Sequence, residues 1–387
     1  MSHRPIYLDN HATTQMDERV LAAMIPYFRE HFGNPASISH LYGWEAEAAV
    51  KQARNTLAEA IHATSAEIIF TSGATEANNL AIKGVAEAYF YKGRHIITVQ
   101  TEHSAVLDPC RYLEKLGFEI TFLPVQPDGL IDLSKLEKAI RPDTILVSVM
   151  AANNEIGVLQ PLAEIGKICH EHQVLFHTDA AQAIGKISLD VETMKIDLMS
   201  LTAHKIYGPK GIGVLYVRRR HPRVKIAPQI QGGGHERGLR SGTLYTPQIV
   251  GFAKAVALAL EELESESERL LQMRSHLWNS LSQIDRIYLN GHPTQRLPGN
   301  LNISVAGVDG AALILGLQPI VAVSSGSACS SATVAPSHVL LALGHSESLA
   351  YSSIRFGLGR FNTIEEIEQV AQHAIATIQS LRLGSRG

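Results

Sequence analysis

The stretch EIIFTSGATEANNLAIKG, residues 67–84, decides the fold. A short β-branched run leads through a glycine-containing turn into a helical pattern, so it predicts a buried strand followed by a helix. Such a turn presents free backbone N–H groups at the positive end of the helix, an environment suited to a phosphate. We therefore expect an anion site that includes the Thr75 hydroxyl, or else an N-cap in which Thr75 and Glu76 serve only the helix start.

The alternation of strand-like and helix-like segments continues to about residue 220. Six further β-branched runs follow, several of them separated by helical patterns, at 95–100, 119–125, 144–150, 174–182, 198–205 and 212–219. Near-continuous apolar strands that alternate with helices indicate an α/β fold with a mostly parallel sheet covered on both faces. The sequence therefore predicts a seven-stranded sheet.

A second region follows this sheet. One long helical pattern runs from about 247 to 283, and then come strand-like GNLNISV, helix-like GAALILGL and a last helix that opens with TIEEIEQ. We expect a large domain over 15–258. Residues 1–14 and 259–387 would form a smaller α+β domain, which carries a cysteine-bearing loop at about 322–335.

The composition excludes several classes of function. The 387 residues carry a net charge of -3, which gives no electrostatic reason to expect nucleic-acid or membrane-surface binding. Three cysteines without paired spacing favour a reducing compartment, and the start MSHRPIYLDN lacks the features of a targeting segment. The longest apolar run, 249–260, contains a lysine and is too short to cross a bilayer. We expect a cytoplasmic protein, and no metal because C-x-x-C and H-E-x-x-H spacings are lacking.

Reactive side chains collect where the predicted strands end. Ligands of open α/β sheets bind outside the carboxyl ends of the strands, and five strands here end in TSGATEANN, TEHS, AANNE, HTDAAQ and TAHK. Lys205 could form a Schiff base there, while buried Asp179 needs either a cationic partner or backbone donors. His103 could stack on a ring and shuttle protons, or be structural. A phosphate turn, such a carboxylate and such a lysine together are what pyridoxal phosphate requires.

The stretch SSGSACSS, residues 324–331, holds Cys329 among glycine and small hydroxyl side chains. The thiol stands in a turn by accident, or it belongs to a loop that carries it into a site built elsewhere and out again. Cys110 and Cys169 lie in helical patterns, where we expect inert core positions.

Long motifs in a fixed order now identify a family. YLDNHATT, TSGATEANNLAIKG, HTDAAQAIGK, AHKIYGPKGIGVLY, GGGHERGLRSGT, SSGSACSS and SIRFGLGRF cover nearly the whole length. With these motifs the chain resembles the cysteine desulfurases of the NifS and IscS type. These are pyridoxal-phosphate enzymes of the class V aminotransferase family. The resemblance implies the aminotransferase-like fold of fold type I.

The resemblance implies how pyridoxal 5'-phosphate is held. Lys205 would bind it as a Schiff base, Asp179 would pair with the pyridinium nitrogen, and Gln182 would hydrogen-bond the phenolic oxygen. His103 would stack on the ring. The phosphate would be held by the remaining cofactor-binding residues, namely Ala74, Thr75, Thr202, His204 and, across the interface of a homodimer, Thr243.

The resemblance also implies a reaction, the conversion of L-cysteine to L-alanine. Asn154 and Arg355 would grip the substrate carboxylate, for which the planar fork of arginine is suited. Lys205 would move the α-proton with His103 as a further catalytic group, and Cys329 would take the sulfur as a persulfide. A sulfur-acceptor protein or an iron-sulfur scaffold would receive it. The alternatives are a selenocysteine lyase or cysteine/cystine C–S lyase, a class V transaminase, and a non-catalytic partner of sulfur proteins.

Overall fold

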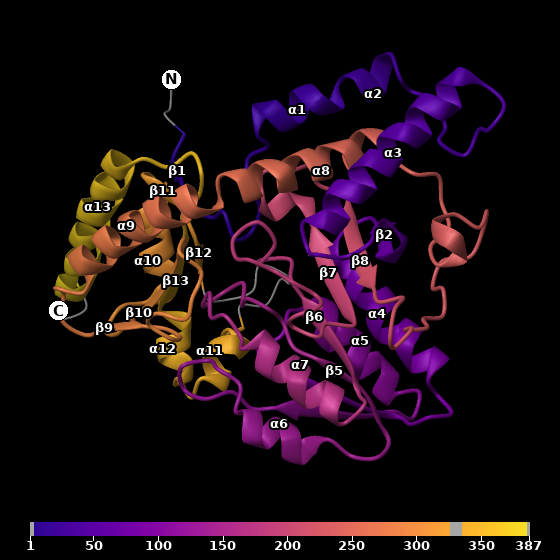
Figure 1. Cartoon of the computed structure of the whole chain (residues 1–387). Helices are drawn as coiled ribbons and strands as arrows, with labels where there is room; N and C mark the ends of the chain where they lie inside the picture. The colour runs from indigo at the N-terminus through magenta and orange to yellow at the C-terminus, as the bar shows by residue number, and fades with distance from the viewer. Residues whose placement is uncertain (1–3, 326–334, 385–387) are drawn as a thin grey trace.

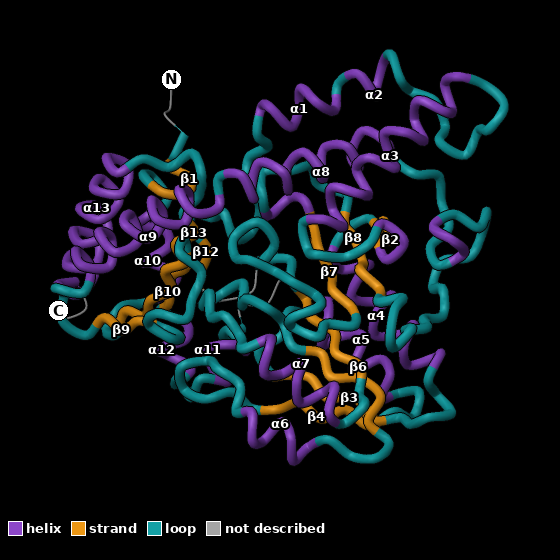
Figure 2. Tube along the Cα trace, in the orientation of Figure 1, coloured by secondary structure: helices purple, strands orange, loops and turns teal. Residues whose placement is uncertain are grey.

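The computed structural model describes residues 4–325 and 335–384, so the predicted loop cysteine, Cys329, lies outside the described residues. Figure 1 shows a large region around one sheet and a smaller region that holds the described ends of the chain. The smaller region packs against one side of the larger. Figure 2 colours the helices, strands and loops of both regions differently.

A seven-stranded sheet forms the centre of the large region. Its strand order is β2-β8-β7-β6-β5-β3-β4, and β8 alone runs antiparallel to its two neighbours. This confirms the predicted mostly parallel seven-stranded sheet. Each strand falls within its predicted run: β2 Ile68–Thr71, β3 His95–Val99, β4 Glu119–Leu123, β5 Thr144–Ser148, β6 Leu175–Asp179, β7 Leu198–Thr202 and β8 Gly213–Val217.

Helices cover both faces of this sheet. Alternate strand residues point to opposite sides, so the apolar side chains of one strand pack against helices on both faces. In β2, Ile69 packs into the apolar cluster that contains α4 and α5, whereas Ile68 and Phe70 pack into the cluster of α3, α7 and α8. No helix in the described part of the chain has the length and apolar character to cross a membrane. The helices of this region are α1 Glu18–Met24, α2 Pro26–Arg29, α3 Leu41–Glu59, α4 Ala74–Ala88, α5 Ser104–Glu114, α6 Leu133–Ala139, α7 Leu162–Glu171 and α8 Thr246–Glu261.

The smaller region has its own apolar core, built on a sheet of order β12-β13-β10-β9 and a parallel β1-β11 pair. GNLNISV and GAALILGL form the strand and the helix predicted for them, β10 Asn300–Val305 and α10 Gly310–Leu317. The domain bounds stay a prediction. The other elements are β1 Ile6–Tyr7, α9 Leu263–Leu281, β9 Ile287–Leu289, β11 Val321–Ala322, β12 Ser324–Ser325, α11 His338–Ala342, α12 Glu347–Tyr351, β13 Ser353–Gly357 and α13 Ile364–Gly384.

The helix predicted over 247–283 is wrong in one respect, because it is two helices that meet at Glu262. The Glu262 carboxylate accepts from Arg19 Nη1 at 2.6 Å and pairs with Arg360 Nη2 at 3.1 Å. Both α8 and α9 bury apolar side chains, so the helical pattern of apolar residues in the sequence continues across the break. The ion pairs at the break join residues far apart in the sequence, and periodicity cannot reveal them.

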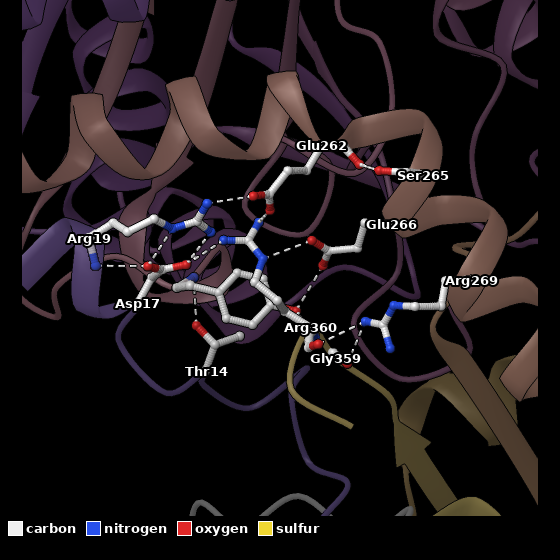
Figure 3. Close-up of polar contacts among 10 residues, drawn as sticks. Thr14, Asp17, Arg19, Glu262, Ser265, Glu266, Arg269, Gly359 and Arg360 are labelled. Atoms are coloured by element: carbon white, nitrogen blue, oxygen red, sulfur yellow. Dashed lines mark hydrogen bonds and ion pairs between the residues drawn. The ribbon is translucent and has the colours of Figure 1, made fainter. Parts of the chain in front are cut away.

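These ion pairs belong to a group that we call the joint cluster, shown in Figure 3. Arg360 lies at its centre, with Nη1 at 2.9 Å from Asp17 Oδ2 and Nε at 2.9 Å from Glu266 Oε2. The Arg360 guanidinium also stacks over the Tyr207 ring at 4.3 Å, two residues after Lys205. The cluster therefore ties both regions to the lysine segment. Its members are Asp17, Arg19, Glu262, Glu266 and Arg360.

Candidate active site

One cavity of about 820 Å³ opens at the carboxyl ends of the central strands and reaches the smaller region. It gathers side chains from β13, from the N-terminal segment and from the turns after five strands. Every predicted site residue in the described part of the chain lines it, except Thr243. These are Ala74, Thr75, His103, Asn154, Asp179, Gln182, Thr202, His204, Lys205 and Arg355.

Lys205 ends a short 3₁₀ turn, Ala203–Lys205, directly after β7. Its Nζ donates to the carbonyl oxygens of His11 at 2.5 Å and Ala12 at 2.6 Å. Burial, followed by the charge of Arg355, lowers the pKa of the Lys205 amine to about 8. A lysine with a lowered pKa has more of the neutral, nucleophilic amine near pH 7.

Asp179 is the last residue of β6 and is 5% exposed. Its carboxylate accepts from Asn78 Nδ2 at 2.7 Å and from the Ala181 N–H at 2.9 Å, and both donors are neutral. Among the described residues no ion pair involves Asp179. A buried carboxylate held only by neutral donors can still pair with a cation in the cavity.

The start of α4 has the backbone that the turn sequence predicts. Gly73 is its N-cap with φ 154° and ψ 179°, a conformation that is essentially restricted to glycine. A Cβ built on Gly73 would meet only Thr202 Oγ1, at 4.0 Å, so the space beside the free N–H groups is open. Glu76 accepts from the Ser72 N–H and pairs with Arg240 at 2.7 Å. The helix start can therefore bind an anion.

Two further side chains face this turn. The His204 Nδ1 lies 3.1 Å from Thr13 Oγ1, and burial, with Lys205 next, lowers the pKa of His204 to about 4. His204 is therefore neutral at pH 7. Thr202 Oγ1 donates to the Ile212 carbonyl at 3.3 Å, so this hydroxyl has to rotate before it can donate to an anion.

His103 is the N-cap of α5 and its side chain is exposed to the cavity. Its Nδ1 accepts from the Ala105 N–H at 3.1 Å, so the proton of the neutral ring sits on Nε2. The backbone of its own helix therefore holds the ring and sets its tautomer.

Arg355 enters the cavity from β13. Its Nη1 donates to the Asn154 carbonyl at 2.8 Å, and Nη2 donates to Asp9 Oδ1 at 2.7 Å and Ser324 Oγ at 3.0 Å. Its Nε is buried and has no hydrogen-bond partner among the described residues. Two donors of the guanidinium, Nε–H and the second N–H of Nη1, thus remain for a further acceptor such as a carboxylate.

Three residues singled out in the sequence lie away from the cavity. Thr243 is exposed, in the segment between β8 and α8, and does not line the cavity. Cys110 and Cys169 are buried in α5 and α7, which confirms their expected core positions, and burial raises the pKa of each thiol. In the described ranges, 4–325 and 335–384, no group of three or more His, Cys, Asp or Glu side chains could hold a metal ion.

Sequence reasoning missed several residues that shape the site. Asn78 contacts Asp179, Asp9 pairs with Arg355, and His11 and Lys186 contact Gln182. The sequence held one indication of Asn78, because it is a polar residue on the apolar face of α4. The others left none, because their partners are more than 100 residues away or their importance depends on burial.

These residues fit pyridoxal phosphate. The glycine turn leaves open space beside free N–H groups for its phosphate, and Asp179 is a buried carboxylate without a cationic partner in the described chain. Lys205 supplies an amine of lowered pKa to the same cavity, and Arg355 retains unpaired N–H donors for a substrate.

Comparison with known proteins agrees with this geometry. Residues 6–370 match the model of the Aminotransferase class-V family. A cysteine desulfurase IscS of Methylobacillus flagellatus is 57% identical over 379 residues, which cover 98% of this chain and 93% of that relative. A mitochondrial cysteine desulfurase of Arabidopsis thaliana is 55% identical, with coverage of 99% and 84%.

Solved structures agree as well. A NifS-like protein superposes with a TM-score of 0.91 at 39% identity, over 97% of this chain and 100% of the other. This confirms fold type I, the enzyme class and the dependence on pyridoxal phosphate that the resemblance implied. The chain therefore belongs to the class V aminotransferase family, as a cysteine desulfurase of the NifS and IscS type.

Proposed function

We propose that this protein converts L-cysteine to L-alanine, that Cys329 receives the sulfur as a persulfide, and that the sulfur then serves iron-sulfur cluster or thio-cofactor synthesis. One observation carries the proposal: Lys205, Asp179 and Arg355 line a single cavity. Ser324 and Ser325 line it too, five and four residues before the thiol in the sequence. The cytoplasm is the proposed location.

Bound pyridoxal phosphate supplies an electron sink for the α-carbon of the amino acid. Lys205 would hold the cofactor and afterwards carry the α-proton on Nζ, for which its pKa of about 8 is suited. Asp179 would keep a proton on the ring nitrogen through charge pairing. His103 would stack on the ring, and Gln182 would donate to the phenolic oxygen. The phosphate would be bound by the first turn of α4, through the Ala74 backbone and the Thr75 hydroxyl, and by Thr202 and His204.

The substrate carboxylate would lie against Arg355 and Asn154. The Arg355 guanidinium is oriented by the Asn154 carbonyl and by Asp9, which leaves its Nε to donate. Charge-assisted bonds of this kind fix the orientation of an amino acid.

The sulfur step would form one bond and break one. The Cys329 thiolate would attack the substrate Sγ, and an S–S bond forms as the Cβ–Sγ bond breaks. The electron pair of the broken bond stays with Cβ, which takes a proton and leaves as the methyl group of alanine. The protein thiol is thereby converted to a persulfide, and no external oxidant or reductant is required.

We also propose a homodimer in which Thr243 reaches the phosphate of the partner's site. A group of large apolar side chains is exposed on α2, the start of α3, the chain on either side of α2 and the residue before α8. Such patches mark interaction surfaces. The Tyr245 ring, two residues from Thr243, packs edge-on against Phe28 with ring centroids 6.1 Å apart. The exposed group comprises Ile25, Phe28, Phe32, Ile38, Leu41, Tyr42, Trp44 and Tyr245.

The test measures alanine released from L-cysteine by the purified holoenzyme and by a Cys329→Ala variant. We expect alanine and a protein-bound persulfide from the parent, and neither from the variant. A Cys110→Ala variant is the matched control, because that thiol is buried. Pyruvate and free sulfide released equally well by the parent and by Cys329→Ala would indicate a C–S lyase, and equal alanine from both would show that Cys329 is not the sulfur acceptor. Amino-group transfer to an oxo acid without sulfur release would indicate a transaminase.

A further inference from the structure

We propose that Lys186 is a positioning residue that acts through Gln182 and sets which end of the Gln182 amide faces the cofactor. Lys186 does not line the main cavity. It lies behind Gln182, beside a much smaller cavity whose walls include His11, Tyr207 and Glu266. The inference rests on the proposed function, specifically on the role of Gln182 as a donor to the cofactor, and deepens it.

The contacts determine the orientation of the amide. Lys186 Nζ donates to Gln182 Oε1 at 3.1 Å. In its protonated form Lys186 has donors and no acceptor, so the amide atom that faces the ammonium is the oxygen. His11 Nδ1 lies 3.1 Å from the same oxygen, whose two lone pairs are then both used.

The nitrogen of the amide is used only in part. Gln182 Nε2 donates to the His11 carbonyl at 2.8 Å, which occupies one of its two hydrogens. Since Gln182 lines the main cavity, its remaining capacity there is one N–H donor. A donor stabilises negative charge on a phenolic oxygen, whereas an amide oxygen in that place would repel it.

The imidazole ring of His11 is a weaker constraint on the amide oxygen than Lys186 is. Burial keeps the pKa of His11 well below its usual value, so its ring is neutral. A neutral imidazole donates from one nitrogen and accepts at the other, so it can face either end of an amide. The reversed amide is therefore disfavoured at both ends of Gln182, by Lys186 at the oxygen and by the His11 carbonyl, which only accepts, at the nitrogen.

The surroundings account for an amine at this buried position. Burial, and next the charge of Lys205, lower the pKa of Lys186 to about 7, with Arg355 acting in the same direction and Glu266 in the opposite one. Glu266 belongs to the joint cluster of Figure 3, in which three carboxylates face two guanidinium groups. Glu266 is thus the carboxylate of the cluster that favours the charged form of Lys186.

The experiment compares holoenzymes with Lys186→Met, Lys186→Arg, Gln182→Leu and the double change Lys186→Met with Gln182→Leu. One readout is the pKa of the bound cofactor chromophore, taken from its absorption bands between pH 6 and 10. The other is the Kd of pyridoxal phosphate for the apoprotein, followed by fluorescence. Neither requires turnover. Lys167→Met, at an exposed helix position, is the control for loss of a lysine charge.

Loss of Lys186 should raise the chromophore pKa by about 0.4 to 1 pH unit, because the donor that stabilises the phenolate is no longer held in place. The Kd should rise about threefold to tenfold. Lys186→Arg keeps donors without an acceptor and should behave as the parent. In the Gln182→Leu background, Lys186→Met should add nothing.

Two results would overturn the inference in distinguishable ways. If Gln182→Leu shifts both readouts and Lys186→Met shifts neither, the role of Lys186 is wrong and that of Gln182 stands. If Gln182→Leu shifts neither, the proposed role of Gln182 is wrong and the inference falls with it. Lys186→Ala replaces Lys186→Met should the latter fold poorly, with the same outcomes expected.

Discussion

The amine of Lys205 should react as a nucleophile near neutral pH in the apoprotein. Its pKa is lowered from 10.5 to about 8. At pH 7 about a tenth of such an amine is neutral, against about one in 3,000 for an ordinary lysine, a difference of about 300-fold. The cause is burial in the cavity wall, followed by repulsion from the Arg355 guanidinium.

Trace acetylation of the apoprotein between pH 6 and 11, read by mass spectrometry of the Lys205 peptide, would measure this. Exposed Lys167 in the same sample corrects for the reagent. We expect a midpoint near pH 8, since the protonated amine does not react. Arg355→Met should move that midpoint upward, because it removes a positive charge. A midpoint above pH 10, or a downward shift in Arg355→Met, would refute the reasoning.

Three further predictions concern stability. Burial, and next Asp179, raise the pKa of Glu102, so the folded state retains a proton that the unfolded chain loses above about pH 4.5. The stability contributed by that proton is present below pH 4.5 and is lost as pH rises. Glu102→Gln cannot lose it, so in urea unfolding the free energy of unfolding of the variant, relative to that of the parent, should be larger at pH 8 than at pH 5. An equal difference at both pH values would contradict this. Arg360→Met leaves carboxylates of the joint cluster unpaired and should destabilise by about 3–5 kcal/mol, whereas exposed Arg141→Met should cost about 1 kcal/mol or less. Similar losses from the two arginine changes would show that burial does not matter. Gly73→Ala should cost about 1–3 kcal/mol through backbone strain and raise the Kd of pyridoxal phosphate, and an unchanged unfolding midpoint would disprove the strain.

Much of the site could be predicted because its chemistry follows the ends of strands. A short β-branched run predicts a strand from local sequence alone, and parallel strands bring their carboxyl ends to one edge of the sheet. TSGATE, TEHS, HTDAAQ and TAHK were therefore expected to meet, and the structure places residues from all four around one cavity. The order of the motifs identified the family, and the family in turn predicted the cofactor.

What the sequence by itself determined was the order and type of the elements, because hydrophobic period and turn residues act over a few neighbours. Only the tertiary structure decided the break at Glu262, the pairing of Asp9 with Arg355 and the contact of Lys186 with Gln182. Asp9 and Arg355 are 346 residues apart in sequence. The value of a charge or an amide depends on burial and on the partner beside it, and both are properties of the packed chain.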